Sequence, residues 1–160
     1  VYKRQENYHY EMELVFALKS GGTKITEADA LSHIYGCAAG LDMTRRDLQN
    51  KAKENRKPWD TAKDVDESAV ITPLRQMSEV PSVASGRIHL SQNGTVKQDA
   101  DLSEMVWSVP EIIADLSTMY TLQQGDVIYM GTPAGVGAVS RGDVLTGGVE
   151  GIGDFEVKIA

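Results

Sequence analysis

Two glutamates, Glu11 and Glu13, lie two positions apart in a stretch, residues 10–19, whose composition is typical of a β-strand. Side chains of a strand alternate between its faces, so both carboxylates point to the same side, with Cα atoms roughly 7 Å apart. A divalent cation between them would remove their repulsion, and hard cations such as Mg²⁺ prefer oxygen ligands. The alternative is a solvated polar face, which the surface preference of Glu favours when the pair is considered alone.

The neighbours of this pair favour a buried site. The opposite face of the same strand is entirely apolar, and the Glu face itself continues with Val15 and Ala17. The apolar face consists of Met12, Leu14, Phe16 and Leu18. Because a carboxylate that is buried without a partner is costly, the pattern predicts that the two glutamates hold a cation at the end of a buried strand.

A third carboxylate, Asp42, ends a second apolar stretch, residues 34–43, just before a polar helix expected over residues 44–55. Emerging from the end of a buried strand, it is placed to join a metal site. Asp is also a good helix N-cap, and the sequence leaves both interpretations open. Arg46 and Gln49 follow at four and seven positions, on one helical face with Asp42. The Arg fork suits a substrate carboxylate, and Gln offers a donor and an acceptor, although a solvated helix face would have the same pattern.

Lys63 and Thr132 are two further candidates. Lys63 lies in a long loop with short extended pieces that we expect over residues 60–83, where it could stabilise a developing enolate or could simply be solvated. Thr132 lies in the glycine-rich stretch 131–137, which lacks the Lys of a P-loop and the context of a dinucleotide site. Its hydroxyl and the nearby backbone N–H groups could hold a carboxylate, or the stretch could be a tight structural turn.

The elements that must position these residues are mostly short strands. We expect a helix over residues 26–33 and a hairpin, 87–91 with 95–98, around Asn93-Gly94. An amphipathic segment, 103–120, predicts a helix whose regular part begins at Ser108 with Pro110 in its first turn. Its core stripe would be Ile112, Ile113, Leu116 and Met119. With further strands at 126–130, 143–146 and 155–159, the fold class is mostly β with a few helices (α+β).

Composition sets the broad class. The 160 residues, 41% apolar and 24% charged, predict a single globular, soluble domain. A net charge of −7 disfavours nucleic-acid binding. No apolar stretch approaches the roughly 20 residues that a membrane span needs, so we expect no membrane partner. The single cysteine, Cys37, cannot form an internal disulfide, which indicates a cytoplasmic location.

Four segments, in their order along the chain, resemble the fumarylacetoacetate hydrolase family, and in particular its small acylpyruvate and fumarylpyruvate hydrolases. They are HYEMEL (9–14), GLDMTRRDLQ (40–49), KPWDTAK (57–63) and GDVIYMGTPAGVG (125–137). The resemblance implies a mixed β-sandwich roll that forms a homodimer. It also implies hydrolysis of a C–C bond in a 1,3-diketo acid, such as fumarylpyruvate, to pyruvate and a carboxylic acid during the catabolism of aromatic compounds. The alternatives are a decarboxylase or tautomerase of a keto acid such as oxaloacetate, or a non-catalytic homologue.

The same resemblance assigns the site residues. It places Glu11, Glu13 and Asp42 on the ligand positions of a divalent metal, with Mg²⁺ expected and Mn²⁺ or Ca²⁺ as alternatives. Arg46, Gln49 and Thr132 fall on substrate-binding positions, and Lys63 falls on a catalytic position. The list of site residues implied by the resemblance is therefore Glu11, Glu13, Asp42, Arg46, Gln49, Lys63 and Thr132.

One departure from the family concerns the base. Family members carry a catalytic His–Glu pair on a lid that precedes the E-x-E strand. The ten residues ahead of Glu11 contain no matching His-x-x-Glu. We therefore expect residues 1–160 to be a catalytic domain without its N-terminal lid region, and the general base to lie outside them.

Overall fold

The computed structural model describes residues 7–160, so the first six of the ten residues ahead of Glu11 lie outside it. Its strands form three antiparallel sheets. The five-stranded sheet has the order β5-β3-β2-β9, with β6 also paired to β3, and its strands are β2 (Met12–Leu18), β3 (Ile34–Asp42), β5 (Ala69–Ile71), β6 (Arg75–Gln76) and β9 (Val127–Tyr129). The four-stranded sheet, β12-β11-β7-β8, contains β7 (Arg87–Gln92), β8 (Thr95–Asp101), β11 (Val144–Val149) and β12 (Gly153–Lys158). The three-stranded sheet, β10-β1-β4, contains β1 (Tyr8–Tyr10), β4 (Thr44–Arg45) and β10 (Gly137–Ala138).

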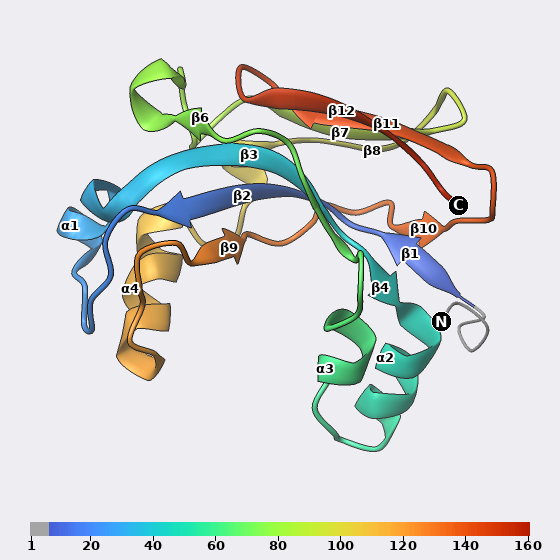
Figure 1. Cartoon of the computed structure of the whole chain (residues 1–160), viewed down its shortest axis with the longest axis horizontal. Helices are drawn as coiled ribbons and strands as arrows, with labels where there is room; N and C mark the ends of the chain where they lie inside the picture. The colour runs from blue at the N-terminus through green and yellow to red at the C-terminus, as the bar shows by residue number, and fades with distance from the viewer. Residues whose placement is uncertain (1–6) are drawn as a thin grey trace.

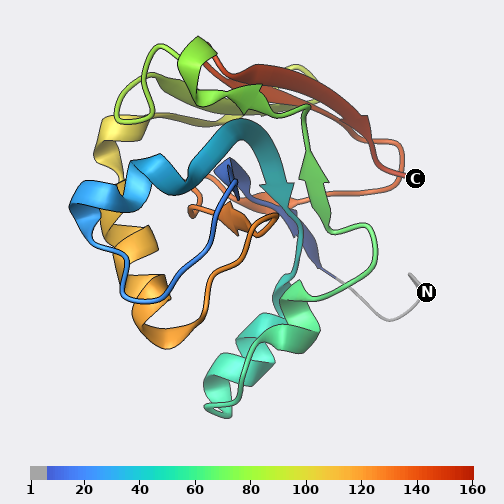
Figure 2. The same ribbon diagram turned by 60° about the vertical axis from the view of Figure 1, so that its left-hand side comes forward.

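The helices lie at the two ends of these sheets. The α-helices are α1 (Glu27–Ala30), α2 (Arg46–Glu54), α3 (Asp60–Lys63) and α4 (Val109–Met119), and the short 3₁₀ helices are Leu31–His33, Met77–Glu79 and Leu102–Glu104. In Figure 1, α1 and α4 lie near one end of the long strands β2 and β3, and α2 and α3 lie together beyond the other end. Figure 2 shows the curved strands wrapping around the interior as a roll. The expected mostly β fold with a few helices is therefore confirmed.

The core lies between the five-stranded and four-stranded sheets. β2 is buried on both faces along its whole length. Its alternate residues Met12, Leu14 and Phe16 belong to one apolar cluster with Leu90 of β7 and Leu145 of β11. The apolar alternation that is visible in the sequence thus places one face of β2 in the core and leaves the other for the glutamates.

Two local predictions are confirmed by backbone geometry. Asn93 and Gly94 have φ angles of 52° and 78°, as a two-residue turn between β7 and β8 requires. Ser108 caps α4 through a reciprocal capping box with Glu111, and Pro110 lies in the first turn. One residue of the expected stripe is wrong: Met119 is 61% exposed, because it occupies the last turn of α4 beyond the core.

Three predicted boundaries are wrong for tertiary reasons. The strand expected over 10–19 is interrupted at Glu11, since Tyr8–Tyr10 joins a different sheet from Met12–Leu18. The helix expected from 44 begins at Arg46, because Thr44 and Arg45 pair with β1 as strand β4. In the segment 60–83 the expected short extended pieces are present as β5 and β6, but the start of the expected loop is wrong, because it forms α3 and Lys63 is the last residue of that helix.

None of the helices within residues 7–160 combines the length and the apolar character that crossing a bilayer would need.

Candidate metal centre

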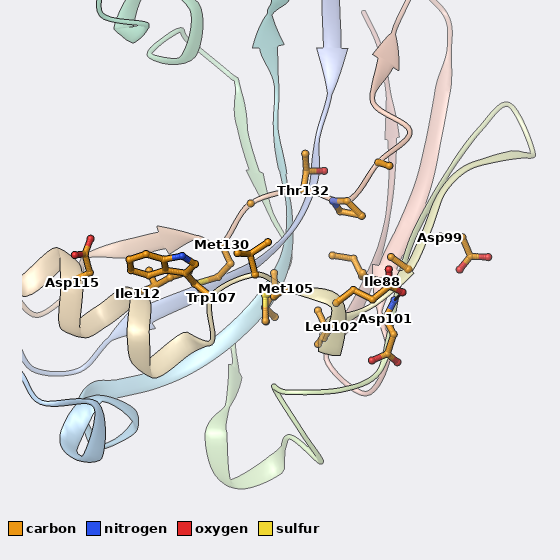
Figure 3. A pocket seen from close by; sticks show the side chains of 17 residues that line it. Ile88, Asp99, Asp101, Leu102, Met105, Trp107, Ile112, Asp115, Met130 and Thr132 are labelled. Atoms are coloured by element: carbon orange, nitrogen blue, oxygen red, sulfur yellow. Dashed lines mark hydrogen bonds between the residues drawn. The ribbon is translucent and has the colours of Figure 1, made fainter.

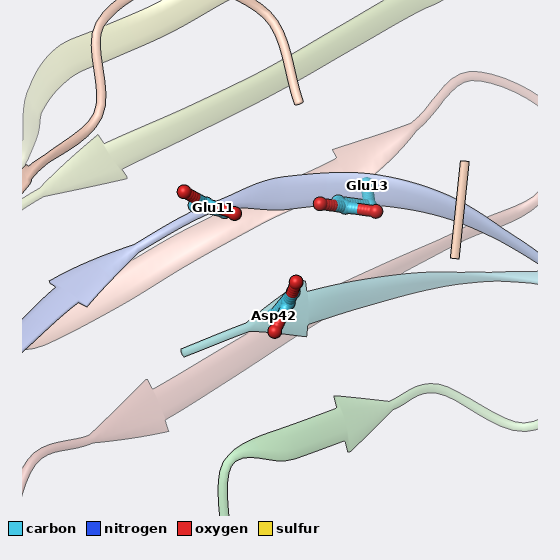
Figure 4. Close-up of side chains that lie close together, drawn as sticks. All are labelled: Glu11, Glu13 and Asp42. Atoms are coloured by element: carbon cyan, nitrogen blue, oxygen red, sulfur yellow. The ribbon is translucent and has the colours of Figure 1, made fainter. Parts of the chain in front are cut away.

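Antiparallel pairing of β2 and β3 brings three carboxylates together. Glu13 lies opposite Gly40 in this pair, and the backbone N–H of Asp42 donates to the carbonyl oxygen of Glu11 at 2.9 Å. One carboxylate oxygen of each of Glu11, Glu13 and Asp42 lies within 4.8 Å of the other two. Figure 4 shows the three side chains converging from the two adjacent strands. Residues some 30 positions apart in sequence thus form one cluster of oxygen ligands.

Two cationic side chains partner this cluster. The Lys63 Nζ donates to Glu11 Oε2 at 2.6 Å and to Asp42 Oδ2 at 2.5 Å. Arg46 Nη2 donates to Glu11 Oε1, and its Nη1 donates to Gln49 Oε1 at 2.6 Å. Hydrogen bonds therefore connect five of the predicted site residues in one network. Lys63 bridges Asp42 and Glu11, and Arg46 joins Glu11 to Gln49.

Burial sets the protonation of the cluster. Glu13 is 3% exposed, and this burial raises its pKa to about 7. The N–H of Gly131 opposes that shift, while the charges of Asp42 and Glu11 add to it. Burial alone would lower the pKa of Lys63, but its hydrogen bonds to Asp42 and Glu11 outweigh the burial, so its pKa is raised. Lys63 is accordingly an ammonium group at neutral pH and acts as a positive charge, not as a base.

The donor set fits a divalent cation. Three carboxylates and two cationic side chains carry a net charge of −1 when all are ionised, and a divalent cation would change this to +1. Hard oxygen ligands on rigid strands are what Mg²⁺ and Mn²⁺ prefer. A site of net positive charge would in turn attract an anionic substrate. Glu11, Glu13 and Asp42 are thus suited to hold the metal, and Lys63 and Arg46 border it.

Short helices position Lys63 and Arg46. Arg46 is the first residue of α2, one turn ahead of Gln49. Lys63 ends α3, where its backbone N–H donates to the Trp59 carbonyl at 3.3 Å. The Lys53 ammonium lies 4.7 Å from the ring centre of Trp59, a cation–π contact that joins the two helices. The sequence predicted that Asp42, Arg46 and Gln49 share one face of a helix. This is wrong for Asp42, which ends β3. Asp42 is not the helix N-cap either, because Arg45 occupies that position of α2.

The glycine-rich stretch 131–137 reaches the cluster through its backbone. The Gly131 N–H donates to Glu13 Oε2 at 2.7 Å, so a loop amide does hold a carboxylate, and that carboxylate belongs to the protein. The Thr132 hydroxyl accepts a hydrogen bond from Gln98 Nε2 at 2.8 Å. No hydrogen bond between Thr132 and the other predicted site residues is found in the described chain, and it adjoins the cluster through Gly131. The sequence reasoning missed Gln98, because a glutamine between Lys97 and Asp99 gives no signal of burial.

A cavity of about 700 Å³ lies on the other face of β2 from the glutamates, where Leu14 lines it. Its lining is mainly apolar and includes Met105, Trp107, Ile112 and Met130. Figure 3 shows Thr132 at the border of this cavity. The loop at Thr132 therefore separates the carboxylate cluster from an open apolar space.

A roll of curled antiparallel sheets that presents three converging carboxylates and a lysine defines a class of metal-dependent enzyme domain. The model of the C-terminal domain of fumarylacetoacetate (FAA) hydrolase matches residues 1–160. The chain belongs to this family.

Relatives of known name cover nearly all of the chain. It is 51% identical over 156 residues to the fumarylpyruvate hydrolase of Ralstonia sp, which covers 98% of this chain and 81% of that protein. It is 36% identical over 153 residues to the oxaloacetate tautomerase FAHD1 of Rattus norvegicus, with 96% and 69% of the two chains covered. Among solved structures, the fumarylpyruvate hydrolase of Pseudomonas aeruginosa in complex with Mn²⁺ and pyruvate matches with a TM-score of 0.97 at 41% identity, covering 100% of this chain and 69% of that one.

Proposed function

We propose that this protein is a metal-dependent hydrolase that cleaves the C–C bond of a 1,3-diketo acid, with fumarylpyruvate as its substrate and pyruvate and fumarate as its products. The observation that carries the proposal is the cluster of Glu11, Glu13 and Asp42 with the Lys63 ammonium against it. The 51% identity to a fumarylpyruvate hydrolase supports the choice of substrate. By this assignment the protein belongs to the catabolism of aromatic compounds.

Glu11, Glu13 and Asp42 would hold the divalent cation, for which we propose Mg²⁺, with Mn²⁺ as a functional substitute. When bound, the cation supplies Lewis-acid polarisation of substrate oxygens and neutralises charge that develops on them. The Mn²⁺ in the Pseudomonas aeruginosa structure supports a divalent metal of this kind.

Arg46 and Gln49 orient the substrate in this mechanism. Arg46 lies beside Glu11 and presents a guanidinium whose planar fork matches a carboxylate. Gln49 accepts a hydrogen bond from Arg46 through Oε1, which keeps the guanidinium in place, and its amide NH₂ would donate to the substrate. Thr132 would contact the substrate from the loop on the other side of Glu13.

The bond change balances with one molecule of water. A hydroxyl adds to the distal ketone carbon, and the bond from that carbon to the neighbouring CH₂ breaks. The electron pair stays with the CH₂ group as the enolate of pyruvate, which then takes up a proton. Lys63 stabilises the enolate as an ammonium, since its pKa is raised.

The base that activates the water lies outside this set of residues. The three carboxylates serve as metal ligands, and Lys63 and Arg46 are cationic. We propose that residues 1–160 are a catalytic domain, and that the water-activating base is the His–Glu pair that the family resemblance places on a lid ahead of the E-x-E strand.

Hydrolysis of fumarylpyruvate in H₂¹⁸O tests the proposal. With Mg²⁺ or Mn²⁺ present, fumarate and pyruvate should form in equal amounts, and one ¹⁸O should enter the new carboxylate of fumarate. Removal of the metal with EDTA should abolish the reaction, and acylpyruvates of different chain length would define the acyl preference. Loss of substrate without fumarate, or fumarate without ¹⁸O, would overturn the hydrolase assignment.

A second candidate function is tautomerisation of a keto acid such as oxaloacetate. The observation that favours it is the 36% identity to an oxaloacetate tautomerase, together with a cluster that needs no water base to stabilise an enolate. Enol–keto conversion of oxaloacetate that is faster than fumarylpyruvate hydrolysis under the same conditions would favour this second function.

We further propose that the protein is a cytoplasmic homodimer. The free thiol of Cys37 suits a reducing compartment. The dimer is proposed from the family to which the chain belongs.

A further inference from the structure

Gln98 of β8 is a fully buried polar side chain that lies outside the cluster of charged site residues. Its Oε1 accepts a hydrogen bond from the backbone N–H of Met12 at 3.0 Å. Its Nε2 donates to the Thr132 hydroxyl and to the carbonyl oxygen of Pro133, both at 2.8 Å. One amide group thus joins the strand that carries the two glutamates to the loop that carries Thr132.

The Met12 N–H lies between the two glutamates, at an edge where the strand ladder stops. β3 pairs with one edge of β2 along its length, while β9 pairs with the other edge only from Val15 to Ala17. The last backbone bond on that edge runs from Met130 N to the Leu14 carbonyl at 3.0 Å. No strand pairs with this edge at Met12, and the side-chain oxygen Oε1 of Gln98 accepts the hydrogen bond from the Met12 N–H instead. A buried N–H requires such an acceptor.

The loop at Thr132 has little other support. One side of it faces the apolar cavity that Leu14 and Met130 also line (Figure 3). Its other anchors are the Gly131 bond to Glu13 and a close approach at Gly135, which has a φ of +102°. A Cβ at Gly135 would collide with the Lys97 carbonyl oxygen, so the loop lies directly against β8.

A strand irregularity turns Gln98 inward. In the β7–β8 pair, Leu90 lies opposite Gln98 and Ser91 lies opposite Val96, which leaves Lys97 as an extra residue. Such a bulge bends the strand and re-aims its side chains. Val96 is 52% exposed whereas Gln98 is fully buried, although simple alternation would place both on one face.

We propose that Gln98 is a positioning residue that fixes the location of Thr132 relative to Glu11 and Glu13, and so determines the affinity for the bound keto acid. This inference rests on the proposed function, because it assumes that Thr132 contacts the substrate. Gln98 itself acts through Thr132 and through the Met12 backbone.

The test replaces Gln98 by Met, which keeps most of its volume and removes all three hydrogen bonds. Oxalate, a planar mimic of the pyruvate enolate, is the ligand probe and is titrated by calorimetry into the Mn²⁺-loaded protein. Gln98→Met should weaken oxalate binding by about 10- to 100-fold, the scale of a misplaced contact of roughly 1 Å. Mn²⁺ affinity should change by less than about threefold, since Glu13 stays paired with β3 and the Glu11 carbonyl still accepts from the Asp42 N–H.

Two further variants separate positioning from a general loss of structure. Gln92 of β7 also donates two hydrogen bonds from its side chain, to the Ala138 carbonyl at 3.1 Å and to Asp143 Oδ2 at 2.7 Å. Gln92→Met is therefore the matched control and should leave both affinities unchanged. Gly135→Ala displaces the same loop through a collision with the Lys97 carbonyl oxygen and keeps the Gln98 amide group, although the new Cβ would also lie 3.3 Å from Gln98 Cγ. It should reproduce the split between oxalate and Mn²⁺ if Gln98→Met does not fold.

A double-mutant cycle with Thr132→Val completes the test. If Gln98 acts through Thr132, Gln98→Met should cost much less oxalate affinity in the Thr132→Val protein than in the wild type. Equal oxalate binding in wild type and Gln98→Met, full additivity in the cycle, or parallel losses of Mn²⁺ and oxalate would overturn the inference. Failure of the Mn²⁺-loaded wild type to bind oxalate would instead count against the proposed function.

Discussion

Lys63 donates a hydrogen bond of 2.5 Å to Asp42, yet we propose that the two residues act at different stages of the reaction. We propose Asp42 as a metal ligand, which matters before any bond breaks. Lys63 is a partly buried ammonium, and in the proposed mechanism its charge matters when the enolate forms. Substitutions at these two neighbouring residues should therefore give different kinetic signatures.

Lys63→Met keeps much of the bulk of the stem and removes the charge. We expect kcat on fumarylpyruvate to fall about 10²–10³-fold, the scale for losing one preorganised stabilising group. Metal affinity should stay the same or rise slightly, because a positive charge beside the carboxylates has gone. Steady-state kinetics and Mn²⁺ titration measure the two effects.

Asp42→Ala is the contrasting variant and should weaken metal binding and turnover together. Near wild-type turnover in Lys63→Met would mean that Lys63 only neutralises the carboxylates.

Cys37 offers a pH-dependent test of burial. The thiol lies in β3 and is fully buried, and this burial raises its pKa to about 11, against the opposing charge of Arg75. Between about pH 9 and pH 11 the unfolded chain loses the thiol proton and the folded chain keeps it, so folding stability should fall as the pH rises through this window. Urea unfolding at pH 8 and pH 10.5 measures the fall.

Cys37→Ala provides the reference for this test, since it removes the titrating thiol while the other groups remain. The fall in stability with pH should be smaller in the variant than in the wild type. Rapid alkylation of Cys37 in the folded protein at pH 8 would contradict a buried thiol of raised pKa.

At the scale of elements, the spacing between β2 and β3 determines whether the three carboxylates converge. Gly40 lies opposite Glu13 and has no room for a side chain. A Cβ there would lie 2.7 Å from Val15 Cγ2, 2.9 Å from Tyr129 Cε1 and 2.9 Å from the Val70 carbonyl oxygen. The absence of a side chain at this position lets Tyr129 and β5 pack beside the cluster.

Gly40→Ala should therefore cost about 1–3 kcal/mol of unfolding free energy, the usual cost of overpacking. It should also weaken Mn²⁺ binding, because the neighbours that must move are next to Glu13 and Asp42 in the sheet. Chemical denaturation and metal titration measure the two effects separately.

The control is Gly94→Ala at the turn between β7 and β8, where an added Cβ would meet nothing within 4 Å. With its φ of +78°, this change should cost about 1 kcal/mol through backbone strain alone. Its Mn²⁺ affinity should equal that of the wild type. Loss of metal binding in both variants would show that the effect at Gly40 is not local.

At the scale of the whole molecule, the prediction concerns assembly. We expect a symmetric homodimer, from the family to which the chain belongs. Light scattering at micromolar concentration should give twice the chain mass of 17.4 kDa. A monomer under these conditions would contradict it, and the measurement should be made with and without Mn²⁺ because a ligand that binds the assembled form stabilises it.

Features that depend on neighbours in sequence could be predicted without the structure. The Asn93-Gly94 turn and the Ser108 cap of α4 follow from local backbone preferences. The alternation around Glu11 and Glu13 follows from the two-residue period of a strand. These local signals were enough for the mostly β fold class, and the family resemblance added the candidate ligands.

Contacts between residues that are far apart in the sequence were determined only by the tertiary structure. The bonds from Lys63 and Gln98 to the Glu11–Glu13 segment span 52 and 86 residues, and no local pattern specifies them. Lys63 appeared to belong to a loop because a four-residue helix has no readable period, and its place in α3 depends on packing against α2. Gln98 was missed because a bulge at Lys97 reverses the direction of its side chain. The sequence by itself thus determined the chemical types available, and the pairing of distant strands determined which of them meet.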